Sequence, residues 1–140
     1  MVKEFYNNGE LLSSVNVIEG LKEGALYVFS PKGDTLKIKY FSKGKPRGEH
    51  LEYHSNGNLK KIGQYKLGRR YGEWKGYYFD GSISHKYYYK NGFLDGSFLN
   101  FSSDGDTLVY KKYSNGLLNG VDKDYIGTVS YTHLTLPTKA

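Results

Sequence analysis

The sequence predicts an all-β protein, built as an elongated single-layer antiparallel meander of stacked β-hairpins. The first observation behind this prediction is a gapless repeat of 24 residues, marked by three series of glycines. The second is composition, since 15 Tyr, 7 Phe and 18 Gly in 140 residues, with 1 Met and no Cys, favour strands and turns over a deep aliphatic core. A period of this length is typical of stacked units that cannot bury their apolar faces alone.

The glycine series set the register of the repeats. The three series are Gly24, Gly48, Gly72, Gly96 and Gly120; Gly9, Gly33, Gly57, Gly81 and Gly105; and Gly20, Gly44, Gly68, Gly92 and Gly116. They predict a repeat array over residues 1–127, with repeats at 1–24, 25–48, 49–72, 73–96 and 97–120 and a partial sixth from residue 121.

Many of these glycines follow Asn or Asp, as in Asn56-Gly57, Asp80-Gly81 and Asn91-Gly92. Such pairs are typical of type I′ hairpin turns, because both residues tolerate positive φ. We therefore expect each repeat to supply two antiparallel strands. In the third repeat, residues 50–54 and 59–66 are predicted strands, residues 55–58 a turn and residues 67–72 a longer return loop.

Aromatic residues recur at half the period. Ten of the eleven residues spaced 12 apart are aromatic: Phe5, Val17, Phe29, Phe41, Tyr53, Tyr65, Tyr77, Tyr89, Phe101, Tyr113 and Tyr125. In a meander we expect these side chains to form a ladder on one face, with neighbours about 5 Å apart. The ladder is predicted to be the core of the sheet, and a stack that binds a ligand is the alternative.

The net charge of +6 is distributed unevenly. Residues 1–24 sum to −2, residues 25–48 to +5 and residues 49–72 to +3, and the residues after Gly72 sum to zero. Basic character therefore belongs to the second and third repeats and not to the whole array, and a nucleic-acid partner is not predicted.

The basic side chains of these two repeats are predicted to share one edge of the sheet, because Lys43–Arg47 and Lys66–Arg70 occupy equivalent return loops. The candidate partner-binding or lipid-binding residues are Lys43, Lys45, Arg47, Lys66, Arg69 and Arg70, with Trp74 and Tyr78 as exposed aromatic anchors; Lys60 and Lys61 belong to the same basic group. The alternative is a solvated edge, which Lys and Arg protect against pairing with other sheets.

No common catalytic signature is present in the sequence. It has no cysteine nucleophile, no G-x-S-x-G elbow, no phosphate-binding loop and no H-E-x-x-H helix, so we predict that the protein is not an enzyme and needs no cofactor. His50 and His54 would lie about 13 Å apart on a strand, too far to share a metal. Each is expected to be a surface histidine, and no metal site is predicted.

The ends of the chain bear on localisation. The start, MVKEFYNNGELLSSV, has no apolar stretch of signal-peptide length, so the sequence as written predicts a cytoplasmic protein, with export left open if the N-terminus is incomplete. Residues 128–140 are expected to be a non-native tail, since Val129–Thr138, VSYTHLTLPT, resembles a translated sequencing adapter. A natural C-terminal strand is the alternative.

The phrases GEWKGYYFDGSI, YYYKNGFLDG and YKKYSNGLLNG resemble the MORN-repeat variant of bacterial proteins, some of which are labelled YwqK-type antitoxins. The resemblance covers about residues 1–127 and is closest in the fourth repeat. It implies an extended antiparallel sheet of stacked hairpins that serves in binding or assembly, without one fixed ligand.

These observations together predict a non-catalytic binding or scaffold module that mediates protein–protein interaction, with an antitoxin-like role as a special case. The partner protein is not identified by the sequence, and no small-molecule substrate is predicted. One alternative is association with an anionic membrane through the basic edge. A second alternative is cell-wall or carbohydrate binding by the aromatic repeats, which requires export.

Overall fold

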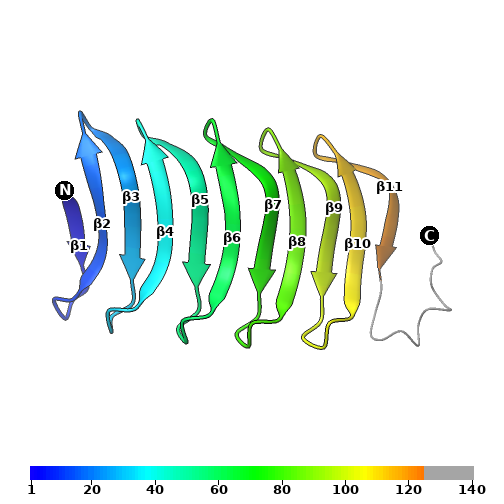
Figure 1. Ribbon diagram of the computed structural model, residues 1–140, viewed down its shortest axis with the longest axis horizontal. Coiled ribbons are helices and arrows are strands. Elements are labelled where there is room, and N and C mark those ends of the chain that lie inside the picture. The colour runs from blue at the N-terminus through cyan, green and yellow to red at the C-terminus, as the bar shows by residue number, and fades with distance from the viewer. Residues whose placement is uncertain (125–140) are drawn as a thin grey trace.

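The computed structural model describes residues 1–124, which form one open antiparallel sheet of eleven strands in the order β1 to β11 (Figure 1). Each strand pairs only with its neighbours in sequence, so the sheet is a single-layer meander, as the repeat predicted. The strands are β1 (Val2–Phe5), β2 (Leu11–Ile18), β3 (Leu21–Phe29), β4 (Thr35–Ser42), β5 (Lys45–Tyr53), β6 (Leu59–Lys66), β7 (Arg69–Tyr77), β8 (Ile83–Lys90), β9 (Phe93–Phe101), β10 (Thr107–Ser114) and β11 (Leu117–Asp124).

The strands follow the 24-residue repeat. The nine-residue strands β3, β5, β7 and β9 begin at Leu21, Lys45, Arg69 and Phe93, so each starts 24 residues after the one before. The strand predicted at residues 59–66 has these bounds in the structure. The expected tail at residues 128–140, including Val129–Thr138, lies outside the described residues.

Two kinds of connection join the strands, and they lie at opposite ends of the strands, along the two long sides of the sheet (Figure 1). At the upper edge of the view, which we call the turn edge, two-residue turns precede β3, β5, β7, β9 and β11. At the opposite edge, which we call the loop edge, five-residue loops occupy residues 6–10, 30–34, 54–58, 78–82 and 102–106.

The turn edge has the type I′ geometry that the sequence predicted, since both residues of each turn have positive φ. Asn91-Gly92 and Asn115-Gly116 are two of these turns. The same prediction is wrong at the loop edge: in Asn56-Gly57 only the glycine has positive φ, because Gly57 N–H donates to the His54 carbonyl and closes a longer loop.

The predicted return loop at residues 67–72 is also wrong. Only Leu67 and Gly68 form the turn, and Arg69–Gly72 belong to β7. Gly72 has a φ of 71° inside that strand, next to the register shift between Ile62 and Gln64 of β6. The glycine therefore forms a bulge inside the strand, rather than part of a loop.

The predicted aromatic ladder divides into two rows. Because successive strands run in opposite directions, residues 12 apart fall at opposite ends of neighbouring strands: Tyr53 ends β5 at the loop edge, whereas Tyr65 lies near the turn edge of β6. Tyr65 pairs with Gly48 and Arg70 and not with another ladder residue. The expected spacing of about 5 Å between consecutive members is thus wrong.

A small aromatic core covers one face of the sheet. Trp74 lies between Tyr65 and Tyr89, with ring centroids 5.3 and 6.1 Å away, and His50 is 5.3 Å from the Trp74 ring. The buried apolar side chains of the described residues are Val15, Phe41 and Trp74, and none is completely buried. A single-layer sheet has no second layer to cover it, so the aromatic rings cover one another. The described residues include no helix long and apolar enough to cross a membrane.

Candidate functional site

The basic residues predicted to bind a partner or lipid lie at the turn edge. Lys43 is the first residue of its turn, and Lys45 and Arg47 follow in β5. Lys66 ends β6, and Arg69 and Arg70 begin β7. All six side chains are exposed. They lie in or beside two-residue turns, and not in the longer loops that the sequence predicted. The structure does bring them to one edge, as predicted. We call these six residues the basic turn edge.

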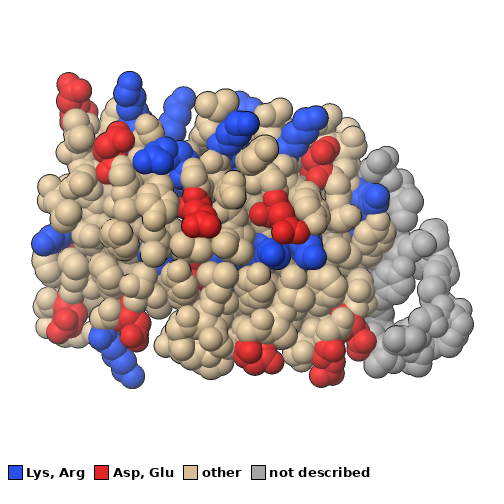
Figure 2. All heavy atoms as spheres, viewed as in Figure 1, with Lys and Arg blue, Asp and Glu red and all other residues tan. Residues whose placement is uncertain are grey.

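Charge differs between the two edges of the sheet (Figure 2). Lys22 and Lys90 extend the basic turn edge on its two sides, whereas the loop-edge loops hold one basic residue, Lys32. The acidic residues of those loops are Glu10, Asp34, Asp80, Asp104 and Asp106. Lys60 and Lys61 lie at the start of β6, toward the loop edge, and so are separate from the basic turn edge.

At one position, the two repeats that carry the basic turn edge lack an acidic residue that neighbouring repeats have. Glu23 Oε1 accepts a hydrogen bond of 2.9 Å from Lys43 N–H in the next turn, and Asp95 Oδ1 accepts one of 3.1 Å from Asn115 N–H. The two intervening repeats have Arg47 and Tyr71 at this position. The repeats that carry the basic residues therefore lack the carboxylates that cap the next turn elsewhere.

Arg70 is held in place by aromatic rings. Its guanidinium lies 5.2 Å from the Trp74 ring centroid and 5.4 Å from that of Tyr89, and its Nη1 donates to the Tyr89 hydroxyl at 3.2 Å. Lys66 Nζ is 5.0 Å from the ring of Tyr71. Such cation–π contacts favour these positions of the charged groups by about 0.5–1 kcal/mol at exposed sites.

A hollow of about 520 Å³ lies between two neighbouring turns of this edge. Its lining includes Lys66, Arg69, Arg70 and Lys90, with Leu67 and Tyr71 among them. Four basic side chains around one hollow favour an anionic group, and an arginine guanidinium can hold a carboxylate by two parallel hydrogen bonds.

Apolar side chains project from the same edge. Leu67, at the tip of its turn, is 87% exposed and stands between Lys66 and Arg69. Leu21, Phe93 and Leu117, which follow other turns, are also exposed. The turn edge therefore combines positive charge with apolar tips.

Residues 46–67 and 70–91 match the family model described as MORN repeat variant. These two segments are similar to MORN repeats. The match covers less than half of the chain and confirms the resemblance seen in the sequence. It includes Arg47, Lys66 and Arg70 of the basic turn edge and leaves out Lys43, Lys45 and Arg69.

No curated protein matches the sequence. Among solved structures, the chain is similar to the crystal structure of accessory secretory protein 1,2 and 3 in Streptococcus pneumoniae, with 13% identity over 86% of this chain and a TM-score of 0.40. The chain spans 23% of the length of that protein chain.

Trp74, in the second matched segment, was predicted to be an exposed anchor, and this prediction is wrong. Its side chain is 4% exposed, and its Nε1 donates to the Gln64 carbonyl at 3.2 Å. The equivalent positions one period away hold His50 and Phe98. These positions hold the signal in the sequence for the buried ring, since the third, fourth and fifth repeats each place a ring there.

Tyr78 lies at the loop edge, away from the basic turn edge. It is half-buried, and its hydroxyl donates to the Phe101 carbonyl at 2.5 Å, so it joins two successive repeats. The structure therefore does not bring Tyr78 together with the basic residues, and its exposure was overestimated.

His50 was predicted to lie at the surface, and this is wrong as well, because it is 5% exposed. Its Nε2 lies 2.7 Å from Glu52 Oε2, and its Nδ1 has no hydrogen-bond partner. Burial lowers the pKa of His50, Lys39 and Lys37 act in the same direction, and the Glu52 carboxylate opposes them. The neutral ring is thus favoured, with the Nε2 proton donated to Glu52.

The described residues contain no group of three or more His, Cys, Asp or Glu side chains placed to hold a metal ion. His54 is half-buried, and its Nε2 is 2.8 Å from the Tyr77 carbonyl, which gives this ring a structural contact at the loop edge.

Proposed function

We propose that this chain is a non-catalytic binding scaffold, and that its basic turn edge binds an acidic surface of a partner protein. The observation that carries the proposal is the exposure of six basic side chains on two consecutive turns of one edge. Opposite charges on two protein surfaces accelerate association and fix orientation.

The frame holds these charges at a regular spacing. Gly44 N–H donates to the Lys22 carbonyl of β3 at 2.8 Å, and Gly92 N–H donates to the Arg70 carbonyl of β7 at 3.1 Å, so each of these two turns is bonded to the strand that follows the preceding turn. Equivalent turns are two strands apart, about 10 Å. A partner with carboxylates at a similar spacing would contact several basic groups without reordering the scaffold, which lowers the entropic cost of binding.

The hollow between turns gives the edge a specific contact point. Arg70 is already ordered on Trp74 and Tyr89, so a carboxylate that enters the hollow meets a fixed guanidinium. The MORN repeats support a binding role in general, and the choice of an acidic protein rests on charge. An antitoxin role is one form of this function, in which the partner is a toxin.

The experiment is affinity capture at moderate salt followed by identification of retained proteins. We expect a discrete partner, which is lost from the variant Lys45→Glu/Arg69→Glu and released as ionic strength rises. The matched control is Lys32→Glu/Lys60→Glu, which changes the net charge equally on the loop-edge side and should retain the partner. Failure of the correctly folded wild-type chain to retain any protein, or equal loss in both variants, would contradict the proposal.

A second candidate function is association with an anionic membrane through the same edge. The observation that favours it is Leu67, which is 87% exposed between Lys66 and Arg69. Basic residues next to apolar tips suit the boundary between anionic headgroups and acyl chains.

Sedimentation with vesicles of phosphatidylglycerol and phosphatidylcholine in equal parts tests this candidate. Binding should weaken at higher ionic strength and after reversal of Lys66, Arg69 and Arg70 to Glu. It should also weaken in Leu67→Asn, which keeps every charge. Indifference to salt and to the charge reversals would exclude the membrane function.

A further inference from the structure

The turn edge repeats one joint between a turn and the strand that follows the preceding turn. In three of these joints the second residue of the turn, a glycine, donates its N–H to a carbonyl of that strand. The pairs are Gly44 with Lys22, Gly92 with Arg70 and Gly116 with Leu94, at 2.8, 3.1 and 2.6 Å. All three pairs occupy equivalent positions of the 24-residue repeat, so the three turns lie in the same way against the neighbouring repeat.

Two of these joints also contain a carboxylate. Glu23 Oε1 accepts a hydrogen bond of 2.9 Å from Lys43 N–H. Asp95 Oδ1 accepts one of 3.1 Å from Asn115 N–H. Each donor is the first residue of its turn, and each acceptor directly follows the residue whose carbonyl bonds to the glycine. The fold itself therefore holds a carboxylate in front of this N–H.

The joint at Asn91 keeps the backbone geometry without the carboxylate. Asn91 has a φ of 52°, close to the 48° of Lys43 and the 50° of Asn115. The residue equivalent to the two carboxylates is Tyr71, whose side chain is 45% exposed. The hydrogen bonds of the described residues include none from Asn91 N–H. This donor is thus open to an acceptor from another molecule.

Basic side chains surround this donor. Tyr71 and Asn91 line the hollow of about 520 Å³ between the two turns, and the basic residues of its lining are Lys66, Arg69, Arg70 and Lys90. Of the described residues that line it, none is acidic. A backbone N–H and several cations at one place favour an anion, and guanidinium groups bind carboxylates by charge-assisted hydrogen bonds.

We propose that this hollow binds the side-chain carboxylate of an aspartate or glutamate in a partner polypeptide. One carboxylate oxygen accepts from Asn91 N–H, in the way that the chain's own carboxylates do at the two other joints. The other oxygen faces the guanidinium groups of Arg69 and Arg70. This inference rests on the acidic partner proposed above, and it identifies the group of the partner that is bound and the backbone donor that fixes its position.

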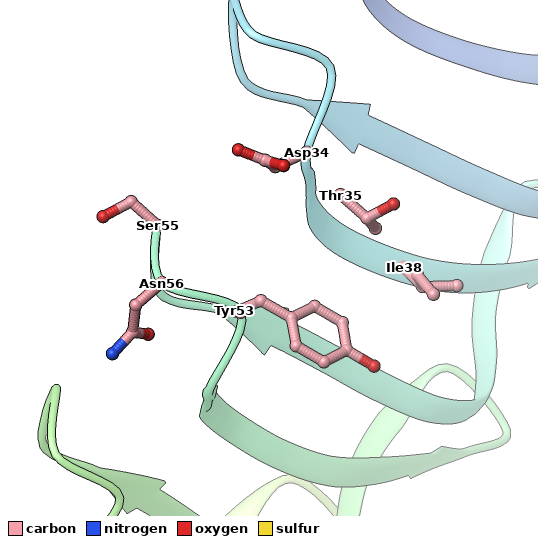
Figure 3. Close-up of a pocket in the computed structure, with 7 residues that line it drawn as sticks. Asp34, Thr35, Ile38, Tyr53, Ser55 and Asn56 are labelled. Carbon is pink, nitrogen blue, oxygen red and sulfur yellow. The ribbon is translucent and has the colours of Figure 1, made fainter.

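A second hollow, at the loop edge, provides a comparison within the same chain (Figure 3). It has a volume of about 420 Å³, and its lining includes Ile38, Tyr53 and Asn56. Of the described residues that line it, Asp34 is the charged one and none is basic. A carboxylate is not expected to bind there, so its residues serve as a reference in the experiment.

The probe is the blocked peptide acetyl-Gly-Asp-Gly-amide, whose only carboxylate is the side chain. It is titrated into the ¹⁵N-labelled full chain at low ionic strength and followed by NMR. We expect a saturable downfield shift of the Asn91 amide proton, because a hydrogen bond to a carboxylate deshields it, and no shift at Asp34 or Asn56. The matched asparagine peptide should bind about tenfold more weakly, the usual effect of losing a charge-assisted hydrogen bond.

The variant Tyr71→Asp supplies the carboxylate from within the chain, as Asp95 does at its own joint. It should raise the melting temperature, shift the Asn91 amide proton downfield without peptide and abolish peptide binding. Tyr71→Leu removes the same ring without adding a carboxylate and should still bind. Ser42→Asp adds the same charge at the preceding turn, outside the hollow, and should also keep most of the binding.

Saturation without an Asn91 shift, equal binding of the aspartate and asparagine peptides, or retained binding in folded Tyr71→Asp would overturn the proposal. The titration of the wild-type chain decides the question even if a variant does not fold. The function of the edge is tested separately: a captured partner that is lost from Lys45→Glu/Arg69→Glu but retained by Tyr71→Asp would support the basic turn edge and contradict this site.

Discussion

The indole ring of Trp74 lies directly on Gly63, in the neighbouring strand. A Cβ atom at position 63 would be 2.0 Å from the indole ring, far inside van der Waals contact. The Trp74 ring can be buried here only because residue 63 is a glycine. This pair lies at the centre of the aromatic core, between His50 and Tyr89.

Gly63→Ala should therefore destabilise the sheet by about 1–3 kcal/mol, the usual range for inserting an atom into a packed site. Urea unfolding measures the change. The control is Gln64→Ala, the adjacent exposed residue, whose side chain is not under the indole and whose loss should cost much less. Adding Trp74→Leu to Gly63→Ala should recover part of the loss, and a fully additive double variant would contradict the predicted contact.

The fold was predictable because the 24-residue period shows in glycines, whose positions depend on backbone geometry. The sequence did not separate turns from bulges: Gly68 lies in a turn and Gly72 inside β7, yet both have positive φ. Burial was harder to predict, since a single-layer sheet buries whichever rings meet across strands. The burial of Trp74 and His50 is visible in the sequence at the full period of 24 residues, which places both at equivalent positions. The half period of 12 residues hides it, because residues 12 apart alternate between the two edges.

The location of the six basic residues at one edge was predictable, because charge and position within the repeat can both be read from the sequence. The hollow lined by Lys66, Arg69 and Arg70 was not, because its existence depends on how side chains of two neighbouring turns lie relative to each other.

Stability should fall as the pH drops below neutral. The pKa of His50 is lowered by burial from its ordinary value of 6.5, so the unfolded chain takes up a proton before the folded chain does. For Glu52, burial raises the pKa, but the hydrogen bond from His50 and the charge of Lys61 lower it below its ordinary value of 4.5. Both groups therefore contribute stability that is present above these values and lost as the pH falls through them.

Urea unfolding at a series of pH values tests this prediction. His50→Gln keeps a donor for Glu52 and removes the titrating ring, so its stability should depend less on pH below about 6.5. Some dependence should remain, because burial and Lys61 also lower the pKa of His85. An unchanged pH profile in His50→Gln would show that this histidine does not cause the effect.

Leu67 has a φ of 53°, a left-handed conformation that is unfavourable for a leucine. The equivalent residue of the next turn is Asn91, with a φ of 52°, and asparagine adopts this conformation more readily. Leu67→Asn should stabilise the chain by about 1 kcal/mol. The reverse exchange, Asn91→Leu, is the control and should destabilise it by a similar amount; thermal unfolding compares the two, and equal signs would contradict the argument.

At position 47, an acidic residue would stabilise the next turn, whereas the arginine contributes to the charge of the basic turn edge. Glu23 and Asp95, one and two periods away, accept hydrogen bonds from the backbone of the turn that follows them. Arg47→Glu should supply the same acceptor to the turn at Leu67 and stabilise the chain by about 0.5 kcal/mol, a small gain because the site is exposed. Arg47→Gln, which carries no charge, is the control and should stabilise less.

The same substitution should weaken retention of the acidic partner, since it reverses a charge within the basic turn edge. Thermal unfolding and affinity capture on one set of variants would show both effects. Higher stability together with weaker binding would indicate that Arg47 serves binding through its charge, at the cost of the carboxylate that would accept a hydrogen bond from the next turn. A loss of stability in Arg47→Glu, or unchanged retention of the partner, would contradict this explanation of why Glu23 and Asp95 have no acidic counterpart at position 47.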